Sequence, residues 1–323
     1  MDESILFCAY LLDGKGGGKK IPLNEVESWS PEQGLLWMHF DGNKKDTAQW
    51  LLEKANLDSI IVDALITEDT RPRFLQMTSD GFLLILKGIN VHPKAQPEDM
   101  ISIRIWLEKT KIISVCRHHM WSVSELEKLI SLKAGPKNSA SFVVQTAKLL
   151  LDRMEPLIDE LDSEMDAVEL SFQNHNEALF SKISDIRISA TTVRRYLLPQ
   201  KEAIANLQTI DIEWFDKKYK RFIREHLDRT YRFLEDLELV RDRAGIILDE
   251  IRNRMQGQMN KSMYIFSLVA VLFLPLTFLT GLFGINVGGI PGSETKLGFT
   301  LFCLGAVILT ALLLYIFRRL RWI

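Results

Sequence analysis

Cysteine is scarce in this chain. The 323 residues include Cys8, Cys116 and Cys303, which lie far apart and form no Cys-x-x-Cys pair. An odd count without paired spacing argues against a disulfide framework and favours a reducing compartment for the first 250 residues. The N-terminus also lacks the basic stretch and apolar run of a secretory signal peptide. We therefore expect the large N-terminal part of the chain to stay in the cytoplasm.

Carboxylates are missing from the C-terminal quarter. The chain has 42 Asp and Glu residues, yet only Glu294 lies beyond Glu250. The net charge of -2 therefore says little about partners, because it averages two unlike parts. The overall composition, 47% hydrophobic and 25% charged, excludes collagen, a disulfide miniprotein and a wholly disordered chain.

Two uncharged apolar runs fill the acid-poor part, at residues 263–283 and 298–317. A bilayer core needs about 20 apolar residues per helix, so each run is long enough to cross a membrane. Basic residues flank this pair, with Arg252, Arg254 and Lys261 before it and Arg318, Arg319 and Arg321 after it. The connecting loop, 284–297, carries only Lys296 and Glu294. Because basic residues stay cytoplasmic, we expect both termini inside and the loop outside.

The part before the first run divides in two. Residues 1–135 read as a cytoplasmic α/β domain, with strands near 5–12, 35–40, 82–91, 101–108 and 111–117 and helices near 47–55, 57–67 and 123–132. Lys109 and Thr110 suggest a hairpin between the last two strands. Residues 136–262 read as a helical stalk. The chain then continues as two transmembrane helices, 263–283 and 298–317, with a basic tail at 318–323.

The stalk shows three long helical patterns, at 140–172, at 177–207 and from Asp216 onward. The third meets no strong stop before the membrane, and Pro275 falls where a kink is tolerated. If it continues to Phe283, the helix is about 100 Å long at a rise of 1.5 Å per residue. Such a helix would transmit conformational changes of the cytoplasmic part into the membrane.

An acidic stripe recurs every seven residues on this third pattern, at Asp228, Glu235, Asp242 and Asp249. A seven-residue step nearly holds one face of a helix. The stripe is either an ordinary solvated face or a cation-attracting path that leads into a pore.

A pore needs several copies of the chain, because two helices cannot surround a water-filled conduit. The first apolar run is the better lining helix, since it continues the stalk. The residues expected to line the pore are Met263, Phe266, Ala270, Leu274, Thr277 and Gly281. A ring of the larger apolar side chains could close the pore by dewetting.

Two other patterns invite a chemical interpretation. Residues 14–20, Gly-Lys-Gly-Gly-Gly-Lys-Lys, lack the Ser or Thr of a phosphate loop and favour a solvated turn between strands.

Cys116 and His118 would share one face of a strand and offer two soft metal ligands. Two ligands are too few to form a metal site alone, so a structural or surface role is the alternative. The sequence has no spaced nucleophile–base pair, so we expect no enzyme.

The end of the first apolar run carries the most specific motif, Thr280-Gly-Leu-Phe-Gly-Ile-Asn286. A Gly-x-Asn there, after a very long helix and before a second span, resembles the CorA superfamily of divalent-cation transporters. The continuation Val287-Gly-Gly-Ile-Pro-Gly292 is similar to the ZntB zinc-transport branch of that superfamily. Residues 68–73, Glu-Asp-Thr-Arg-Pro-Arg, also resemble a segment of its soluble domains.

The resemblance implies a homopentameric funnel in the bacterial inner membrane, without a cofactor and without nucleic acid as a partner. It places Gly284, Ile285 and Asn286 in a selectivity ring at the outer mouth, where amide and carbonyl oxygens hold a partly hydrated divalent ion. Glu294 would attract cations there or be an ordinary loop residue. The implied substrate is zinc, within a range that extends to other divalent cations such as nickel and cadmium, and proton coupling stays open. The resemblance also implies that acidic residues of the funnel sense divalent ions, and the matching positions are those of the acidic stripe, Asp228, Glu235, Asp242 and Asp249. A magnesium or cobalt channel is the alternative, and a membrane-anchored signalling or scaffold protein is a second one.

Overall fold

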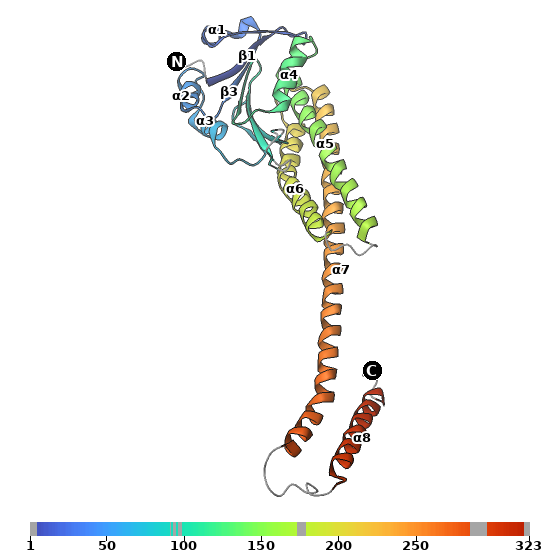
Figure 1. The fold of residues 1–323 in the computed structure, drawn as a ribbon. Coiled ribbons are helices and arrows are strands. Elements are labelled where there is room, and N and C mark those ends of the chain that lie inside the picture. Colours follow the sequence, from blue (N-terminus) through green and yellow to red (C-terminus); the bar gives the residue numbers. More distant parts are fainter. Residues whose placement is uncertain are drawn as a thin grey trace. The chain divides into compact units, whose positions relative to one another are not determined.

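The computed structural model of the chain describes residues 5–90, 92, 95, 99–172, 179–284 and 296–319. The chain forms two compact units, Met1–Leu248 and Asp249–Ile323. Figure 1 shows a mixed sheet with helices in the first unit and two helical segments in the second.

The sheet of the first unit has seven strands in the order β2-β1-β3-β7-β6-β5-β4. Their bounds are β1 Leu6–Leu12, β2 Gly18–Lys20, β3 Leu35–Asp41, β4 Arg73–Gln76, β5 Phe82–Gly88, β6 Ile101–Leu107 and β7 Lys111–Cys116. The central pair, β3 and β7, is parallel, and all other neighbours are antiparallel. The predicted hairpin through Lys109 and Thr110 is confirmed, because Leu107 pairs with Ile112.

Helices cover both faces of this sheet. Short helices α1 Leu23–Glu27, α2 Lys45–Glu53 and α3 Ser59–Ile66 pack on one face, together with Leu83 and Ile85 of β5. Helix α4, Trp121–Ser131, and the long helices pack on the other face, with Phe82 and Leu84. Neighbouring residues of a strand point to opposite faces, so the central strands are buried on both sides and read as continuous apolar runs.

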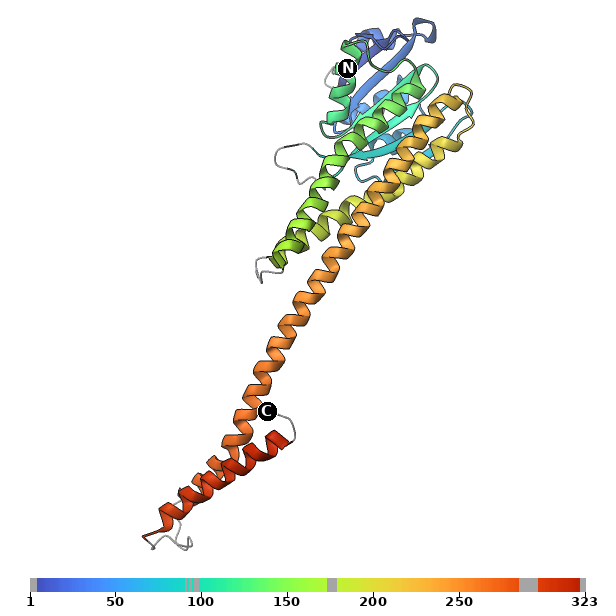
Figure 2. The same cartoon turned by 90° about the vertical axis from the view of Figure 1, so that its right-hand side faces the viewer.

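The three long helices are confirmed. They are α5 Ser139–Phe172, α6 Leu179–Thr209 and α7 Lys217–Gly284, and α7 has 68 residues. Figure 2 shows α5, α6 and the first part of α7 side by side next to the sheet. Side chains from all three, among them Phe142, Ile204 and Ile223, share one core with the sheet. The division expected at residue 135 is thus a change of secondary structure within one compact unit.

Four short elements were not predicted from the sequence: β2, β4, α1 and a 3-10 turn, η2 Pro31–Gln33. The two strands lie at the edges of the sheet, and all of β2 is exposed. An edge strand of three or four residues has no long alternating pattern, and its pairing depends on the neighbouring strand.

The second unit pairs the end of α7 with α8, Gly298–Arg319. Each helix contains an apolar stretch long enough to cross a membrane. The rings of Phe283, near the end of α7, and Phe302, near the start of α8, lie 5.4 Å apart at their centres. The two predicted spans are therefore helical and pack as a hairpin.

Candidate functional site

One face of α7 beyond residue 262 packs towards α8. Its partly buried residues are Leu268, Leu272, Pro275, Leu276 and Leu279, which recur at helical spacing and share one side. Leu276 lines a shallow apolar groove with Ala306 and Thr310 of α8. The hairpin therefore gives α7 an inner side, towards α8, and an open side.

The residues expected to line a pore lie on the open side. Met263, Phe266, Ala270, Leu274, Thr277 and Gly281 point roughly 160–240° away from Leu268, at 3.6 residues per turn. All six are exposed in the single chain, and Phe266 reaches 74%. Large apolar side chains this exposed require a covering of lipid or of further copies of the chain. The common face suits a pore-lining helix, and the pore itself stays a prediction.

Three hydroxyl groups within the two apolar helices form hydrogen bonds to carbonyl oxygens of their own helix. Ser267 donates to the carbonyl oxygen of Met263 at 2.9 Å, and Thr280 donates to that of Thr277 at 3.0 Å. In α8, Thr310 donates to the Ala306 carbonyl at 2.8 Å. Such bonds remove the cost of a hydroxyl in a membrane.

The expected selectivity ring begins where α7 ends. Gly284 is the last residue of the helix. Ile285, Asn286 and Glu294 lie outside the described residues, so their roles stay predictions. The last four carbonyl oxygens of any helix have no intrahelical partner, and they carry the negative end of the helix dipole. The end of α7 can therefore attract a cation without a carboxylate.

The acidic stripe is exposed at all four positions, Asp228, Glu235, Asp242 and Asp249. Two of them form an ion pair with a basic residue of the same helix. Asp242 accepts hydrogen bonds from Arg241 at 2.7 and 2.9 Å, and Asp249 lies 2.9 Å from Arg252. Part of the stripe's charge is thus neutralised. The solvated-face and cation-path interpretations both remain.

Arginines on α7 hold it against α5, a feature that sequence reasoning missed. Arg243 donates to Asp162 and Glu169 at 2.7–2.9 Å and also to Asp166. The hydrogen bonds to Glu169 and Asp166 raise the pKa of the Arg243 guanidinium. The carboxylates lie at helical spacing along one side of α5, and this regular acidic row was the available signal.

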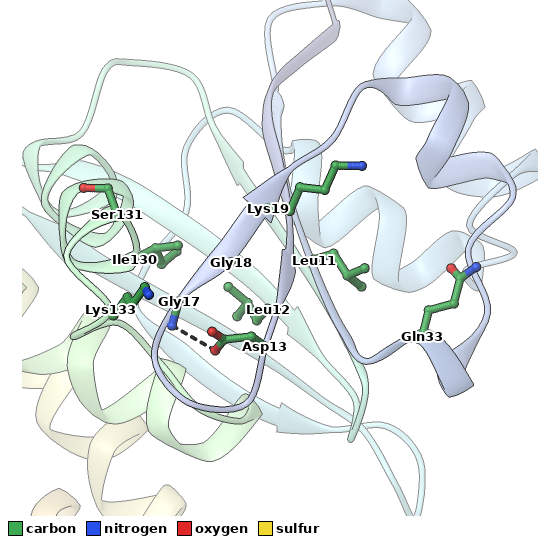
Figure 3. A pocket seen from close by; sticks show the side chains of 10 residues that line it. All are labelled: Leu11, Leu12, Asp13, Gly17, Gly18, Lys19, Gln33, Ile130, Ser131 and Lys133. Atoms are coloured by element: carbon green, nitrogen blue, oxygen red, sulfur yellow. Dashed lines mark hydrogen bonds between the residues drawn. The ribbon is translucent and has the colours of Figure 1, made fainter.

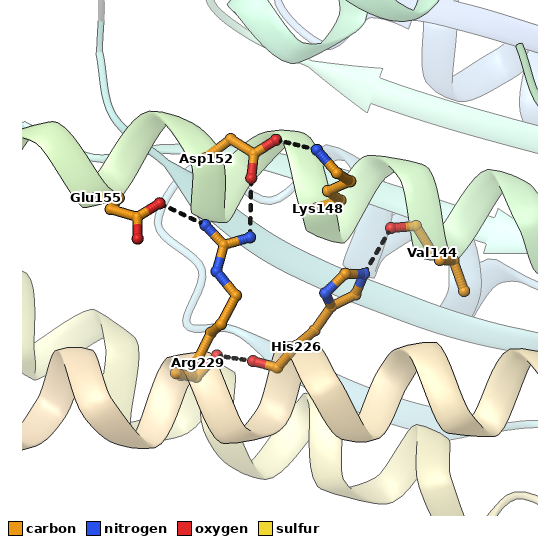
Figure 4. Close-up of polar contacts among 7 residues, drawn as sticks. Val144, Lys148, Asp152, Glu155, His226 and Arg229 are labelled. Atoms are coloured by element: carbon orange, nitrogen blue, oxygen red, sulfur yellow. Dashed lines mark hydrogen bonds and ion pairs between the residues drawn. The ribbon is translucent and has the colours of Figure 1, made fainter. Parts of the chain in front are cut away.

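A second clamp lies earlier along α7, and Figure 4 shows its side chains between α7 and α5. Arg229 donates to Asp152 at 2.8 Å and to Glu155 at 2.9 Å. Beside it, the buried His226 bonds through Nε2 to the carbonyl oxygen of Val144 at 3.1 Å. Burial lowers the pKa of His226, so the neutral form is favoured in this contact. The two clamps tie the start of α7 to α5 within the first unit.

The glycine-rich segment forms a turn whose backbone N–H groups bind a carboxylate of the same segment. The carboxylate of Asp13 accepts hydrogen bonds from the backbone N–H of Lys15 at 2.7 Å and of Gly17 at 2.9 Å. Figure 3 shows the contact with Gly17. Gly16 has a φ of 107° and is buried against the segment after α4, where its carbonyl accepts from Gly135 at 2.8 Å. The prediction of a turn between strands is confirmed, but its middle is packed rather than solvated.

Cys116 and His118 lie in different surroundings. Cys116 ends β7 and is buried in the core, and this burial raises the pKa of its thiol to about 12. His118 follows the strand and is exposed. Zinc binds the thiolate, so the raised pKa disfavours metal binding. Among the residues that the structure describes, no three His, Cys, Asp or Glu side chains are arranged to hold a metal. The pair stays an untested prediction.

Comparison with known proteins covers nearly the whole chain. Residues 32–319 match the family described as CorA-like Mg2+ transporter protein. The divalent cation transporter CmaX of Pseudomonas aeruginosa is 34% identical over 326 residues, 100% of this chain and 98% of that protein. The zinc transport protein ZntB of Yersinia pseudotuberculosis is 31% identical over 315 residues, 98% of this chain and 95% of that protein.

Solved structures agree with these relatives. Full-length CmaX matches with a TM-score of 0.84 at 33% identity, covering 100% of this chain and 99% of that one. The CorA magnesium transporter from Methanocaldococcus jannaschii has a TM-score of 0.77 at 18% identity, covers 100% of both chains and shows the fold alone. The resemblance drawn from the sequence is confirmed, and these relatives are transporters rather than enzymes. The chain therefore belongs to the CorA-like family of divalent-cation transporters.

Proposed function

We propose that this protein transports zinc, together with nickel and cadmium, across the bacterial inner membrane. One observation carries the choice of substrate: a zinc transport protein matches 98% of the chain at 31% identity. The magnesium transporter that shares the fold is only 18% identical. A second relative at 34% identity is named only as a divalent cation transporter, which agrees with a range of substrates.

The pore of the proposed transporter is a ring of α7 helices in a homopentamer. Each α7 would turn its open side, with Ala270 and Thr277, towards the axis, while α8 packs on the other side. Two observations support this arrangement: the six predicted lining residues share one face, and that face is uncovered in the single chain. Native mass spectrometry of the detergent-solubilised protein should give five chains, and a stable monomer would contradict the ring.

The proposed ion site is the ring of Gly284, Ile285 and Asn286 at the outer end of α7. Five asparagine amides and the carbonyl ends of five helices would bind the water shell of a divalent ion. The apolar spans contain no histidine, so zinc would pass at least partly hydrated rather than held by soft ligands. The basic flanks, such as Arg252 and Arg318, support a topology with both termini in the cytoplasm.

The decisive experiment is competitive flux into proteoliposomes. Zinc, nickel, cadmium and magnesium are offered together, with and without a pH gradient. Zinc should enter in preference to magnesium, and a response to the pH gradient would indicate proton coupling. Preferred magnesium uptake would instead favour the magnesium channel, the function that the family description names.

A variant tests the filter assignment separately. Asn286→Ala should lower zinc flux at least tenfold while assembly is unchanged, because the ring loses its amide oxygens. Asn206→Ala, at an exposed position of α6, is the matched control and should keep full flux. Undiminished flux through Asn286→Ala would show that the filter lies elsewhere.

A further inference from the structure

A polar cavity of about 410 Å³ lies in the sheet unit and has no place in the transport proposal. Its wall includes Asn43 after β3, Lys87 near the end of β5 and Arg117 after β7. Strands β3 and β7 are parallel, and β6 runs antiparallel to both β5 and β7. The carboxyl ends of β3, β5 and β7 therefore meet at one edge, where open sheets commonly bind ligands.

Two buried cations form the inner part of this cavity. Lys87 is 6% exposed and Arg104 is 2% exposed, and each is the one charged residue of a largely apolar strand. The Lys87 ammonium donates to the carbonyl oxygen of Met100 at 3.2 Å and lies 4.4 Å from the centre of the Tyr196 ring. In the described part of the chain, no carboxylate lies within ion-pair distance of either cation. A buried charge without an anionic partner is costly, and burial lowers the pKa of Lys87.

The arginines of the cavity have unused donors. Arg104 donates through one terminal nitrogen to the carbonyl oxygens of Thr67 at 2.8 Å and Glu68 at 3.0 Å, after the end of α3. Arg117 donates in the same way to Ile66 at 2.8 Å. The Nε atom of each arginine is buried and has no hydrogen-bond partner within the described residues. Buried donors are usually satisfied, so the protein itself leaves part of the donor capacity of these two guanidinium groups unused, although Arg117 also lies 3.9 Å from the carboxylate of Glu68.

Acidic and basic residues occupy different parts of the cavity. The acidic lining residues, Glu68, Asp69 and Asp99, are all exposed, whereas Lys87 and Arg104 are buried. Charges act more strongly where water is excluded, so the inner part attracts an anion and repels a metal cation. At the opening, the exposed Arg195 of α6 donates to the Tyr196 hydroxyl at 2.8 Å and adds a further cation.

We propose that this cavity binds a phosphate-bearing ligand. Phosphoryl oxygens would accept hydrogen bonds from Lys87 and Arg195, and the guanidinium of Arg104 would add positive charge to the wall, which together match the charge and the donors of a phosphate site. The same chemistry fits free phosphate and the phosphates of a nucleotide, and the cavity has the volume of a small-ligand site. The site is separate from the ion pathway, so its failure would leave the transport proposal untouched.

Isothermal titration of the full-length protein in detergent tests the site with three probes: orthophosphate, pyrophosphate and ATP. We expect saturable binding of one ligand per chain that weakens with added salt. Saturation by orthophosphate alone identifies free phosphate, and at least tenfold tighter binding of pyrophosphate or ATP identifies a polyphosphate. No saturable binding of any probe up to about 10 mM, the range of very weak complexes, would overturn the proposal.

Variants locate the binding. Arg195→Gln should weaken it at least tenfold, and Arg187→Gln, at another exposed arginine about two turns earlier on α6, should not. Lys87→Met should abolish binding, with far-ultraviolet circular dichroism as the check on folding. Because Arg195 is exposed, its variant keeps the test valid even if Lys87→Met misfolds. Equal affinity of Arg195→Gln and the unchanged protein would place the ligand elsewhere and refute this site.

Discussion

The buried His39 should make the stability of the sheet unit depend on pH. It lies in β3 at 4% exposure, with its Nδ1 2.8 Å from the hydroxyl of Ser114. Burial lowers the pKa of His39 from 6.5 to about 4. The folded state therefore binds the proton more weakly than the unfolded state does. The resulting stability is present above pH 6.5 and is lost as the pH falls through 4.

The size of the effect follows from the shift. One pKa unit is worth about 1.4 kcal/mol, so the full loss is about 3 kcal/mol, of which about 2 kcal/mol is lost by pH 5. A shift of this size is large against the free energy of unfolding of a typical domain, about 5–15 kcal/mol. The His39→Asn variant cannot titrate in this range, yet it keeps a polar group towards Ser114.

Urea unfolding followed by tryptophan fluorescence at pH 7 and pH 5 measures this loss, because Trp37 and Trp106 are buried in the same sheet. Phosphate-free buffer avoids any ligand effect. The unchanged protein should lose about 2 kcal/mol more than His39→Asn between these pH values. His118→Asn, at an exposed histidine, should behave like the unchanged protein. If His39→Asn loses as much stability as the unchanged protein, the burial argument for His39 is wrong.

Four further outcomes are expected. Arg243→Gln should make the end of α5 more sensitive to limited proteolysis, because its three carboxylate partners lose their shared cation; unchanged cleavage would mean that the clamp is dispensable. Gly16→Ala should cost about 1–3 kcal/mol in urea unfolding, since its φ is 107° and a carbonyl oxygen lies 2.7 Å from the new Cβ; a neutral result would refute the packed-turn assignment. Ala270→Phe should reduce zinc flux at least tenfold whereas Val269→Phe should not, and equal effects would exclude a special lining face. Asp249→Asn should change how flux depends on internal divalent ions, and no change would favour a solvated face.

Much of the fold follows from patterns that burial imposes on the sequence. Strands β5 and β6 are covered on both faces, so they read as apolar runs, and α7 reads as one helix because no breaker interrupts it before Pro275. The edge strands β2 and β4 are too short and exposed for such a pattern. Their pairing is a property of the assembled sheet.

Of the two candidate sites, one is visible in the sequence and the other is not. The Gly284-Ile285-Asn286 motif is visible in the sequence because its place after a long helix is distinctive. The phosphate cavity is not visible, because Lys87, Arg104 and Arg195 come from three separate elements. Single charges inside apolar strands were the only signal. The alternation rule also failed to place Cys116 and His118 in like surroundings, because β7 ends at Cys116 and the rule applies only within a strand.

The sequence by itself determined the membrane hairpin, the length of α7 and the confinement of carboxylates to the part before residue 251 and to Glu294. These depend on composition and spacing along one chain, which no tertiary contact changes. The tertiary structure decided which side of α7 packs on α8 and which side stays open for Met263 to Gly281. It also decided that Arg229 and Arg243 join α7 to α5. A helical period gives the relative directions of side chains on one helix, but the direction of a neighbouring helix comes only from packing.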